Sequence, residues 1–301
     1  MSDMPKTAAR GAGVLGAVLR SARPRQWTKN LIVFAPIIFS GQLWRYDLLL
    51  VNVVAFAVLC ALSGCAYILN DLADVVEDQR HPAKRDRPIP SGRLRMRHAL
   101  AACALVLVPS LVLADAMGLR FFAFALAYVV AECAYAFALK NVVIVDVCVI
   151  ALAYELRLLA GGAAIGVEVS PWMLVCAGLL ALLLALGKRR HELAAPDVPP
   201  EGRRKALGDY SLGLLDQMIT VMGVTALLAY ALFAVSGEVV TEYGSRRLVY
   251  TVPFVLFGLL RYLYLVHRRG SGGDEDVLVC DGPLVVDVLL WAAMSAMIIY
   301  I

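Results

Sequence analysis

The sequence NDLADVVEDQRHPAKRDRPIP, residues 70–90, decides how this chain is interpreted. It follows a long apolar run, residues 48–69, which ends abruptly at an Asn-Asp pair. At 100° per residue, Asp71, Asp74 and Asp78 lie within about 60° of one another around a helix. Three carboxylates on one helical face repel one another unless a positive group lies between them.

Two interpretations of this stretch are open. Oxygen ligands at this density suit Mg²⁺, which also binds phosphate oxygens, and Lys84, Arg85 and Arg87 follow as groups that hold phosphate. The stretch therefore predicts a site for Mg²⁺ and a diphosphate at the end of a membrane helix. The alternative is a solvated acidic helix end balanced by a basic loop. Acidic residues at a helix C-terminus oppose the helix dipole, so helix stability does not explain their placement.

The composition indicates an integral membrane protein. Of the 301 residues, 61% are hydrophobic and 17% are charged, and the mean hydropathy is +0.75, which is too apolar for a soluble domain. The seven cysteines form no zinc-ligand spacing. Nucleic-acid binding has no support, because the basic residues lie at the ends of apolar segments.

Apolar periodicity predicts an all-α fold with nine transmembrane helices. The first is the least regular, because Pro36 and Gly41 interrupt it. The predicted spans are 27–44, 48–69, 99–117, 119–139, 142–163, 171–188, 217–236, 247–266 and 283–301.

Lysine and arginine predict the orientation. They concentrate in the N-terminal arm, in the loop after residue 78 and in the loop after residue 187, which in a nine-span chain lie on the same side. The positive-inside rule places these segments, and the acidic motif, in the cytoplasm. We expect residues 1–22 to form a basic cytoplasmic arm that is mobile to about residue 20.

Further polar residues lie at membrane depth or at span ends. Asp146, Glu155 and Arg157 lie in the fifth span, and we expect them to face the bundle interior, where either acid could neutralise Arg157. The sequence GKRRHEL, residues 187–193, ends the sixth span. It is either an ordinary anchor or a second group of phosphate donors. Farther on lie Asp209, Tyr210 and Asp216, the last of which is either a helix cap or a site acid.

The motif Asn70-Asp71-x-x-Asp74-x-x-x-Asp78, followed by HPAKRDRPIPSG, resembles the signature of the UbiA-type intramembrane prenyltransferases. The resemblance implies a nine-helix bundle with a central cavity open to the cytoplasmic side, and it covers residues 23–301 as a single catalytic domain. It also implies that Asn70, Asp71, Asp74 and Asp78 hold Mg²⁺.

The chain departs from that family in one place. Typical members carry a second aspartate-rich motif after the sixth helix, where this chain has GKRRHEL. Together with RPRQWTKNLIVFAPIIFSGQL and YELRLLAGG, this resembles the branch that transfers 5-phosphoribose from 5-phosphoribosyl diphosphate to decaprenyl phosphate. That branch makes the lipid-linked pentose donor for actinobacterial cell-wall arabinan. A substrate with anions at both ends calls for two cationic sites, which the extra lysines and arginines would supply.

The resemblance implies an Mg²⁺-dependent glycosyltransferase of the cell membrane, whose partners are 5-phosphoribosyl diphosphate and a polyprenyl phosphate in the bilayer. Asp71, Asp74 and Asp78 are the predicted catalytic residues. Which basic group holds the lipid phosphate and which the C5 phosphate stays open, and a homo-oligomer is one open alternative. The predicted substrate-binding residues are Lys29, Tyr67, Lys84, Arg85, Arg87, Lys140, Arg157, Lys188, Arg189, Arg190, Glu192 and Tyr210.

Two other functions remain as alternatives. In the usual family chemistry a prenyl diphosphate is the electrophile and an aromatic ring is the acceptor, and the cationic GKRRHEL argues against it. An ion-coupled transporter would need paired half-repeats and acids at the midplane, whereas the main acidic cluster lies at a span end.

Overall fold

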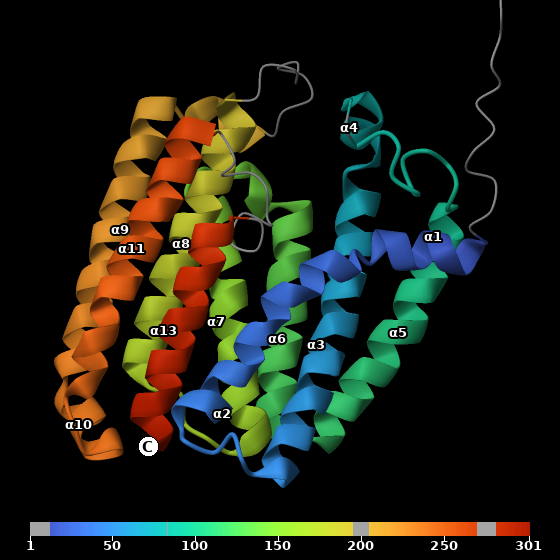
Figure 1. The fold of residues 1–301 in the computed structure, drawn as a ribbon. Coiled ribbons are helices and arrows are strands. Elements are labelled where there is room, and N and C mark those ends of the chain that lie inside the picture. Colours follow the sequence, from blue (N-terminus) through green and yellow to red (C-terminus); the bar gives the residue numbers. More distant parts are fainter. Residues whose placement is uncertain (1–12, 83, 195–204, 270–280) are drawn as a thin grey trace, which may run out of the picture.

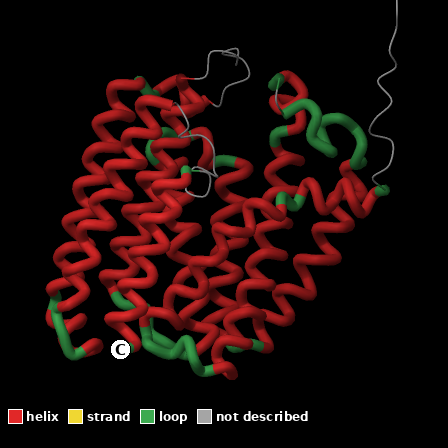
Figure 2. The backbone as a smooth tube through the Cα atoms, in the orientation of Figure 1, coloured by secondary structure: helices red, strands yellow, loops and turns green. Residues whose placement is uncertain are grey.

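The computed structural model describes residues 13–82, 84–194, 205–269 and 281–301 of the chain. Within these ranges the chain forms helices and connecting loops and no strand (Figure 2), which confirms the predicted all-α class. The helices run roughly side by side as one bundle (Figure 1). The elements are α1 Val14–Ser21, η1 Pro24–Phe34, α2 Ala35–Phe39, α3 Tyr46–Ala73, α4 Val75–Arg80, α5 Met96–Ala116, α6 Leu119–Phe137, η2 Leu139–Asn141, α7 Val145–Ile165, α8 Pro171–Ala194, η4 Lys205–Asp209, α9 Leu212–Val235, α10 Gly237–Tyr243, η5 Arg247–Thr251, α11 Val252–Tyr264, η6 Leu265–Arg269 and α13 Gly282–Tyr300.

Eight helices in the described part of the chain are long and apolar enough to cross a membrane. They correspond to the second to ninth predicted spans. Their outward side chains are largely apolar, which suits contact with lipid. The multi-span prediction is therefore confirmed, and the count of nine is corrected to eight regular spans.

The first predicted span, residues 27–44, is a broken segment instead of a regular helix. It runs as the 3₁₀ helix η1 and then as the five-residue α2, with Pro24 at the start of η1 and Pro36 at the start of α2. The segment packs against α3 and α7 and descends obliquely across the bundle (Figure 1). It approaches α7 so closely that a Cβ on Gly161 would lie 2.3 Å from the Val33 carbonyl oxygen.

The predicted N-terminal arm is partly ordered. Residues 1–12 lie outside the described residues, but α1 packs on α3 and α5, with Ala17 buried against Cys65 and Ile68. The expectation of a mobile arm is therefore wrong for residues 14–21. A small residue at Gly64 allows this contact, because a Cβ there would lie 3.2 Å from the Ala22 Cβ.

Helix α7 contributes to two hydrophobic cores. Val147 packs with residues of α8, α9, α11 and α13, whereas Ala153 and Ala160 pack with residues of η1, α3 and α6. Polar residues on α7 therefore lie between the two halves of the bundle. The acidic motif lies at the end of the bundle marked by α4, and α2, α10 and the C-terminus lie at the opposite end (Figure 1).

Candidate functional site

The acidic motif spans a helix break. Helix α3 ends at Ala73, Asp74 leaves helical geometry with φ −100° and ψ 11°, and α4 begins at Val75. The prediction of one continuous helix is therefore wrong, but hydrogen bonds between residues four apart still connect the motif. The Asp74 amide donates to the Asn70 carbonyl at 3.0 Å, and the Asp78 amide donates to the Asp74 carbonyl at 2.8 Å. The break gives the motif a turn in which the carboxylates can diverge toward different partners.

Arg87 joins two of the carboxylates. Its Nη1 donates to Asp71 Oδ1 at 3.1 Å and to Asp78 Oδ2 at 2.7 Å. Arg23 also pairs with Asp71, and Lys84 Nζ lies 3.9 Å from Asp78 Oδ1. Both carboxylates are buried. The basic loop therefore folds back over the acids, as the sequence predicted for Lys84 and Arg87.

The third carboxylate faces another cation. Asp74 forms an ion pair with the largely buried Lys140, from the turn between α6 and α7. Asn70 Nδ2 donates to Asp74 Oδ2 at 3.2 Å. Asn70 Oδ1 is buried and accepts no hydrogen bond from the described residues. A buried carbonyl oxygen without a donor is a ready ligand for a cation or for a substrate hydroxyl.

Two of the predicted residues, Tyr67 and Arg85, lie beside this cluster. Tyr67 is one turn below Asp71, and the Arg23 guanidinium lies 4.9 Å from its ring centroid. Lys29 is half-buried and interacts with a neighbour. Arg85 is exposed, on the loop between Lys84 and Arg87.

Arg157 lies buried in the interior. Its Nε donates to Asn30 Oδ1 at 2.8 Å, and its Nη2 donates to Tyr128 OH at 2.9 Å and to Glu132 Oε1 at 3.5 Å. The guanidinium also faces the ring of Tyr128 at 4.5 Å. The partner acid is therefore Glu132 of α6. The alternative in which Asp146 or Glu155 neutralises Arg157 is wrong.

Asp146 instead pairs with Arg189 of α8. Arg189 Nε donates to Asp146 Oδ2 at 2.5 Å, Nη1 to Glu192 Oε2 at 2.7 Å and Nη2 to Tyr135 OH at 2.8 Å. Tyr210 OH donates to the other Asp146 oxygen at 2.9 Å. Asp146 and Arg189 are both buried, and each of the three nitrogens of this guanidinium donates to a protein oxygen.

The other cations of GKRRHEL point elsewhere. Arg190 pairs with Asp216 of α9 and donates from Nη1 to the Val266 carbonyl at 3.2 Å, so it ties α8 to α9 and η6. His267 Nε2 lies 3.2 Å from the same Asp216 carboxylate. Lys188 is half-buried and interacts with a neighbour. Of the predicted cluster, Arg189 and Glu192 face the interior and Arg190 faces the neighbouring helices.

Electrostatics connect the two clusters. Burial lowers the pKa of His81 below its usual value, the Lys84 ammonium lowers it further, and the carboxylates of Asp78 and Glu192 act in the opposite direction. Glu192, at the end of α8, therefore lies within electrostatic range of the loop that follows α4. Burial also raises the pKa of Tyr210 to about 12, so its hydroxyl stays protonated at neutral pH.

Sequence reasoning missed several polar residues of this interior. Arg23, in the left-handed region with φ 50°, and Asn30 come from the broken first segment. Tyr128, Glu132 and Tyr135 follow an i, i+4, i+7 pattern on α6 and hold the two buried arginines between them. That pattern within an otherwise apolar helix was the available signal.

The oxygen donors of the motif fit Mg²⁺ in kind. They are the carboxylates of Asp71, Asp74 and Asp78 and the Asn70 amide oxygen, to which none of the described residues donates. In the described residues no three acidic, His or Cys side chains converge tightly enough to hold a metal, and Arg87 and Lys140 lie against the carboxylates. Binding a metal there requires these cations to turn away, toward a phosphate for example.

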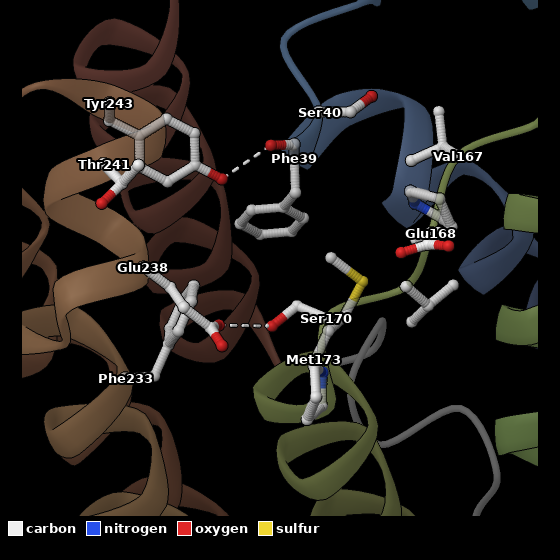
Figure 3. Close-up of a pocket in the computed structure, with 13 residues that line it drawn as sticks. Phe39, Ser40, Val167, Glu168, Ser170, Met173, Phe233, Glu238, Thr241 and Tyr243 are labelled. Carbon is white, nitrogen blue, oxygen red and sulfur yellow. Dashed lines mark hydrogen bonds between the residues drawn. The ribbon is translucent and has the colours of Figure 1, made fainter.

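A separate cavity of about 600 Å³ lies at the opposite end of the bundle. Its walls come from α2, the loop between α7 and α8, and α10 (Figure 3). Tyr243 OH donates to the Phe39 carbonyl at 2.6 Å, and Ser170 Oγ donates to Glu238 at 3.0 Å. The expected central cavity open at the motif end is therefore not the one found here, and none of the predicted site residues lines it.

Comparison with known proteins points to one family. Residues 31–279 match the model of the UbiA prenyltransferase family. The chain is 32% identical over 286 residues to the decaprenyl-phosphate phosphoribosyltransferase of Mycobacterium tuberculosis, covering 94% of each chain. It is 30% identical over 305 residues to the enzyme of that name from Mycolicibacterium smegmatis, covering 98% of this chain and 96% of that one.

The fold agrees with these matches. A UbiA homologue from Archaeoglobus fulgidus, solved bound to GPP and Mg²⁺, superposes with a TM-score of 0.71. The superposition covers 95% of this chain and 100% of that one, at 19% sequence identity.

Proposed function

The chain belongs to the UbiA prenyltransferase family, and we propose that it transfers 5-phosphoribose from 5-phosphoribosyl diphosphate to decaprenyl phosphate, releasing diphosphate. One observation carries the proposal. Four cations, Arg23, Lys84, Arg87 and Lys140, converge on three carboxylates. These cations outnumber the carboxylates by one, an excess of positive charge that suits a substrate with phosphate at both ends.

The donor set of Asn70, Asp71, Asp74 and Asp78 would hold Mg²⁺, which neutralises charge on a diphosphate leaving group. Arg87 and Lys84 are about 28–30% exposed, so they can turn from the carboxylates to phosphate oxygens without entering apolar surroundings. Their hydrogen bonds to the leaving group strengthen as the C1–O bond breaks.

The remaining chemistry asks little of the protein. C1 of ribose gains oxocarbenium character as the diphosphate departs, and the lipid phosphate attacks from the opposite face. That phosphate is already an anion, so no strong general base is required. Positioning is then the main task, and the buried Arg157, fixed by Asn30, Tyr128 and Glu132, is the best-positioned cation for the second phosphate.

We further propose that the motif end of the bundle faces the cytoplasm, where 5-phosphoribosyl diphosphate and Mg²⁺ are available. Lysine and arginine gather in the segments at that end. The prenyl chain would lie against the apolar helix surfaces that face lipid.

The test is a transfer assay on purified protein in detergent, with labelled 5-phosphoribosyl diphosphate, polyprenyl phosphate and Mg²⁺. Label should enter the lipid phase, and EDTA should prevent it. Asp74→Ala should abolish transfer, whereas Asp115→Ala, which changes an exposed acid at the far end of α5, should not. Folded protein that transfers no ribose, but joins a prenyl diphosphate to an aromatic acceptor, would overturn the proposal.

A further inference from the structure

The turn between α6 and α7 holds an unusual backbone conformation. Ile144, the residue before α7, has φ 70° and ψ −47°. In the described part of the chain only Arg23 and Ile144 adopt positive φ without being glycine. A β-branched residue is strongly disfavoured there, because its Cβ crowds the backbone, so such a conformation persists only when its surroundings impose it.

Tyr210 supplies the contact that imposes it. The Ile144 amide donates to Tyr210 OH at 2.7 Å, and the same hydroxyl donates to Asp146 Oδ1 at 2.9 Å. Asp146 is fixed in turn by Arg189 at 2.5 Å. All three polar side chains are buried, so water cannot replace the hydroxyl without a change in packing.

The turn that Tyr210 fixes also carries Lys140. Lys140 lies four residues before Ile144, in the short helix η2, and its ammonium pairs with Asp74 of the acidic motif. Its side chain is largely buried, so the backbone of the turn decides where the ammonium lies. Tyr210 itself makes its two hydroxyl contacts with protein atoms and does not pair with the motif.

We propose that Tyr210 is a positioning residue, whose hydroxyl holds Ile144 in its left-handed conformation and thereby presents Lys140 to Asp74. The Tyr210 ring can pack without this hydroxyl, but the Ile144 amide would then lose the acceptor that it has in this conformation. Ile144 would relax toward negative φ, and the turn would carry Lys140 away from the motif.

The functional consequence rests on the proposed function, in which Lys140 is one of the four cations at the diphosphate site. Loss of the Tyr210 hydroxyl should then raise KM for 5-phosphoribosyl diphosphate by about fivefold and change kcat by less than about twofold, because a fixed charge that binds ground state and transition state alike has been displaced. KM for the lipid substrate should stay unchanged.

The decisive experiment measures the position of Lys140 without any turnover. Folded protein in detergent is acetylated with an amine-reactive reagent, and modification of Lys140 relative to Lys84 is followed by mass spectrometry. Tyr210→Phe should make Lys140 react about fivefold faster, since an ion pair worth about one hydrogen bond is lost. Tyr262→Phe is the matched control, because that buried tyrosine lies in the same core and its hydroxyl has no hydrogen-bond partner among the described residues.

A second substitution separates positioning from general loosening. Glycine adopts positive φ without strain, so Ile144→Gly in the Tyr210→Phe background should restore slow acetylation of Lys140. Ile144→Gly alone should behave as the parent protein. If Tyr210→Phe does not yield folded protein, recovery of folding in the double variant supports the same link.

The proposal is overturned if Lys140 reacts at the parent rate in Tyr210→Phe, or if glycine at position 144 restores neither the labelling nor the fold. Acetylation needs no substrate, so the labelling result can be interpreted even if the protein does not catalyse the proposed transfer reaction. Parent protein that is inactive in transfer but shows the predicted labelling pattern would reject the function and keep the positioning role.

Discussion

The two polar clusters at the motif end are built in opposite ways. In the acidic cluster of Asp71 and Asp78 the carboxylates are buried, and Arg87, which joins them, is 28% exposed. In the arginine cluster the cation itself is buried, with Arg189 2% and Asp146 1% exposed. The first arrangement leaves its cations able to move toward water or a phosphate, and the second does not.

This difference distinguishes residues that can contact the substrate from residues that stabilise the fold. A half-exposed cation gives up a modest, screened interaction when it changes partners, whereas a buried guanidinium cannot leave its partners without stranding a charge. We therefore assign the diphosphate contacts to the acidic cluster and its basic loop, and a structural role to Arg189. Substitutions in the two clusters should accordingly fail in different ways.

The largest effect is expected from breaking the arginine cluster. Arg189→Met leaves the Asp146 carboxylate buried without its cation, so the free energy of unfolding should fall by about 3–5 kcal/mol. Thermal unfolding in detergent measures it. The neighbouring Arg190→Met removes the more exposed pair with Asp216 and should lower stability by less than about 1 kcal/mol.

A double variant controls for the lost packing of the long side chain. Asp146→Asn removes the charge that Arg189→Met strands, so the double variant should recover part of the stability. Equal stability of Arg189→Met and Arg190→Met would contradict the contrast between buried and exposed pairs.

The next largest effect is expected from Asp78→Asn, which should lose activity while the protein stays folded. Asp78→Asn keeps the shape of the side chain, and its partners Arg87 and Lys84 can be solvated, so stability should change by less than about 1 kcal/mol. Transfer activity should fall by about 10²–10³-fold, because a charged ligand of the diphosphate site is lost. Unfolding and kcat/KM are measured on the same preparation, and a variant that loses both in proportion would place Asp78 in the scaffold.

A smaller effect should distinguish charge from geometry in the basic loop. Arg87→Lys keeps one positive charge but loses the planar fork that can hold a carboxylate and a phosphate together, so kcat/KM should fall by about tenfold. The control is Arg97→Lys, an exposed arginine at the start of α5. Full activity of Arg87→Lys would mean that charge alone is used at this position.

Local chemistry made the acidic cluster predictable from sequence. Asp71, Asp74 and Asp78 are close in the chain, and Arg87 follows within one short loop, so spacing alone placed acids and cations together. Arg157 was expected to have a partner, but its partner, Glu132, comes from another helix. The sequence offered Asp146 or Glu155 as that partner, but Asp146 pairs across the bundle with Arg189 instead.

Backbone geometry accounts for the other differences. The first apolar segment reads as a span by composition, but its prolines break it into η1 and α2. No residue type marks Ile144 for a positive φ, since β-branched residues avoid that region, and its amide is paired with Tyr210 from a distant part of the chain. Features imposed by tertiary contacts against local preference are the ones that sequence patterns could not supply.

The smallest expected effect is a pH dependence confined to the loop after α4. Burial lowers the pKa of His81, with Lys84 lowering it further, so the folded protein binds this proton less readily than the unfolded chain does. Stability from this group is therefore complete above the ordinary histidine pKa of about 6.5 and declines as the pH falls below it. His81→Gln should flatten the decline in melting temperature between pH 7.5 and 5.5. Because the carboxylates of Asp78 and Glu192 act in the opposite direction, the shift should be small beside that of Arg189→Met. A decline of the same slope in the His81 variant would mean that the cations of the basic loop do not act on this imidazole. The proposed difference between the acidic cluster with its basic loop and the buried arginine cluster would then have to be tested at another residue of the basic loop.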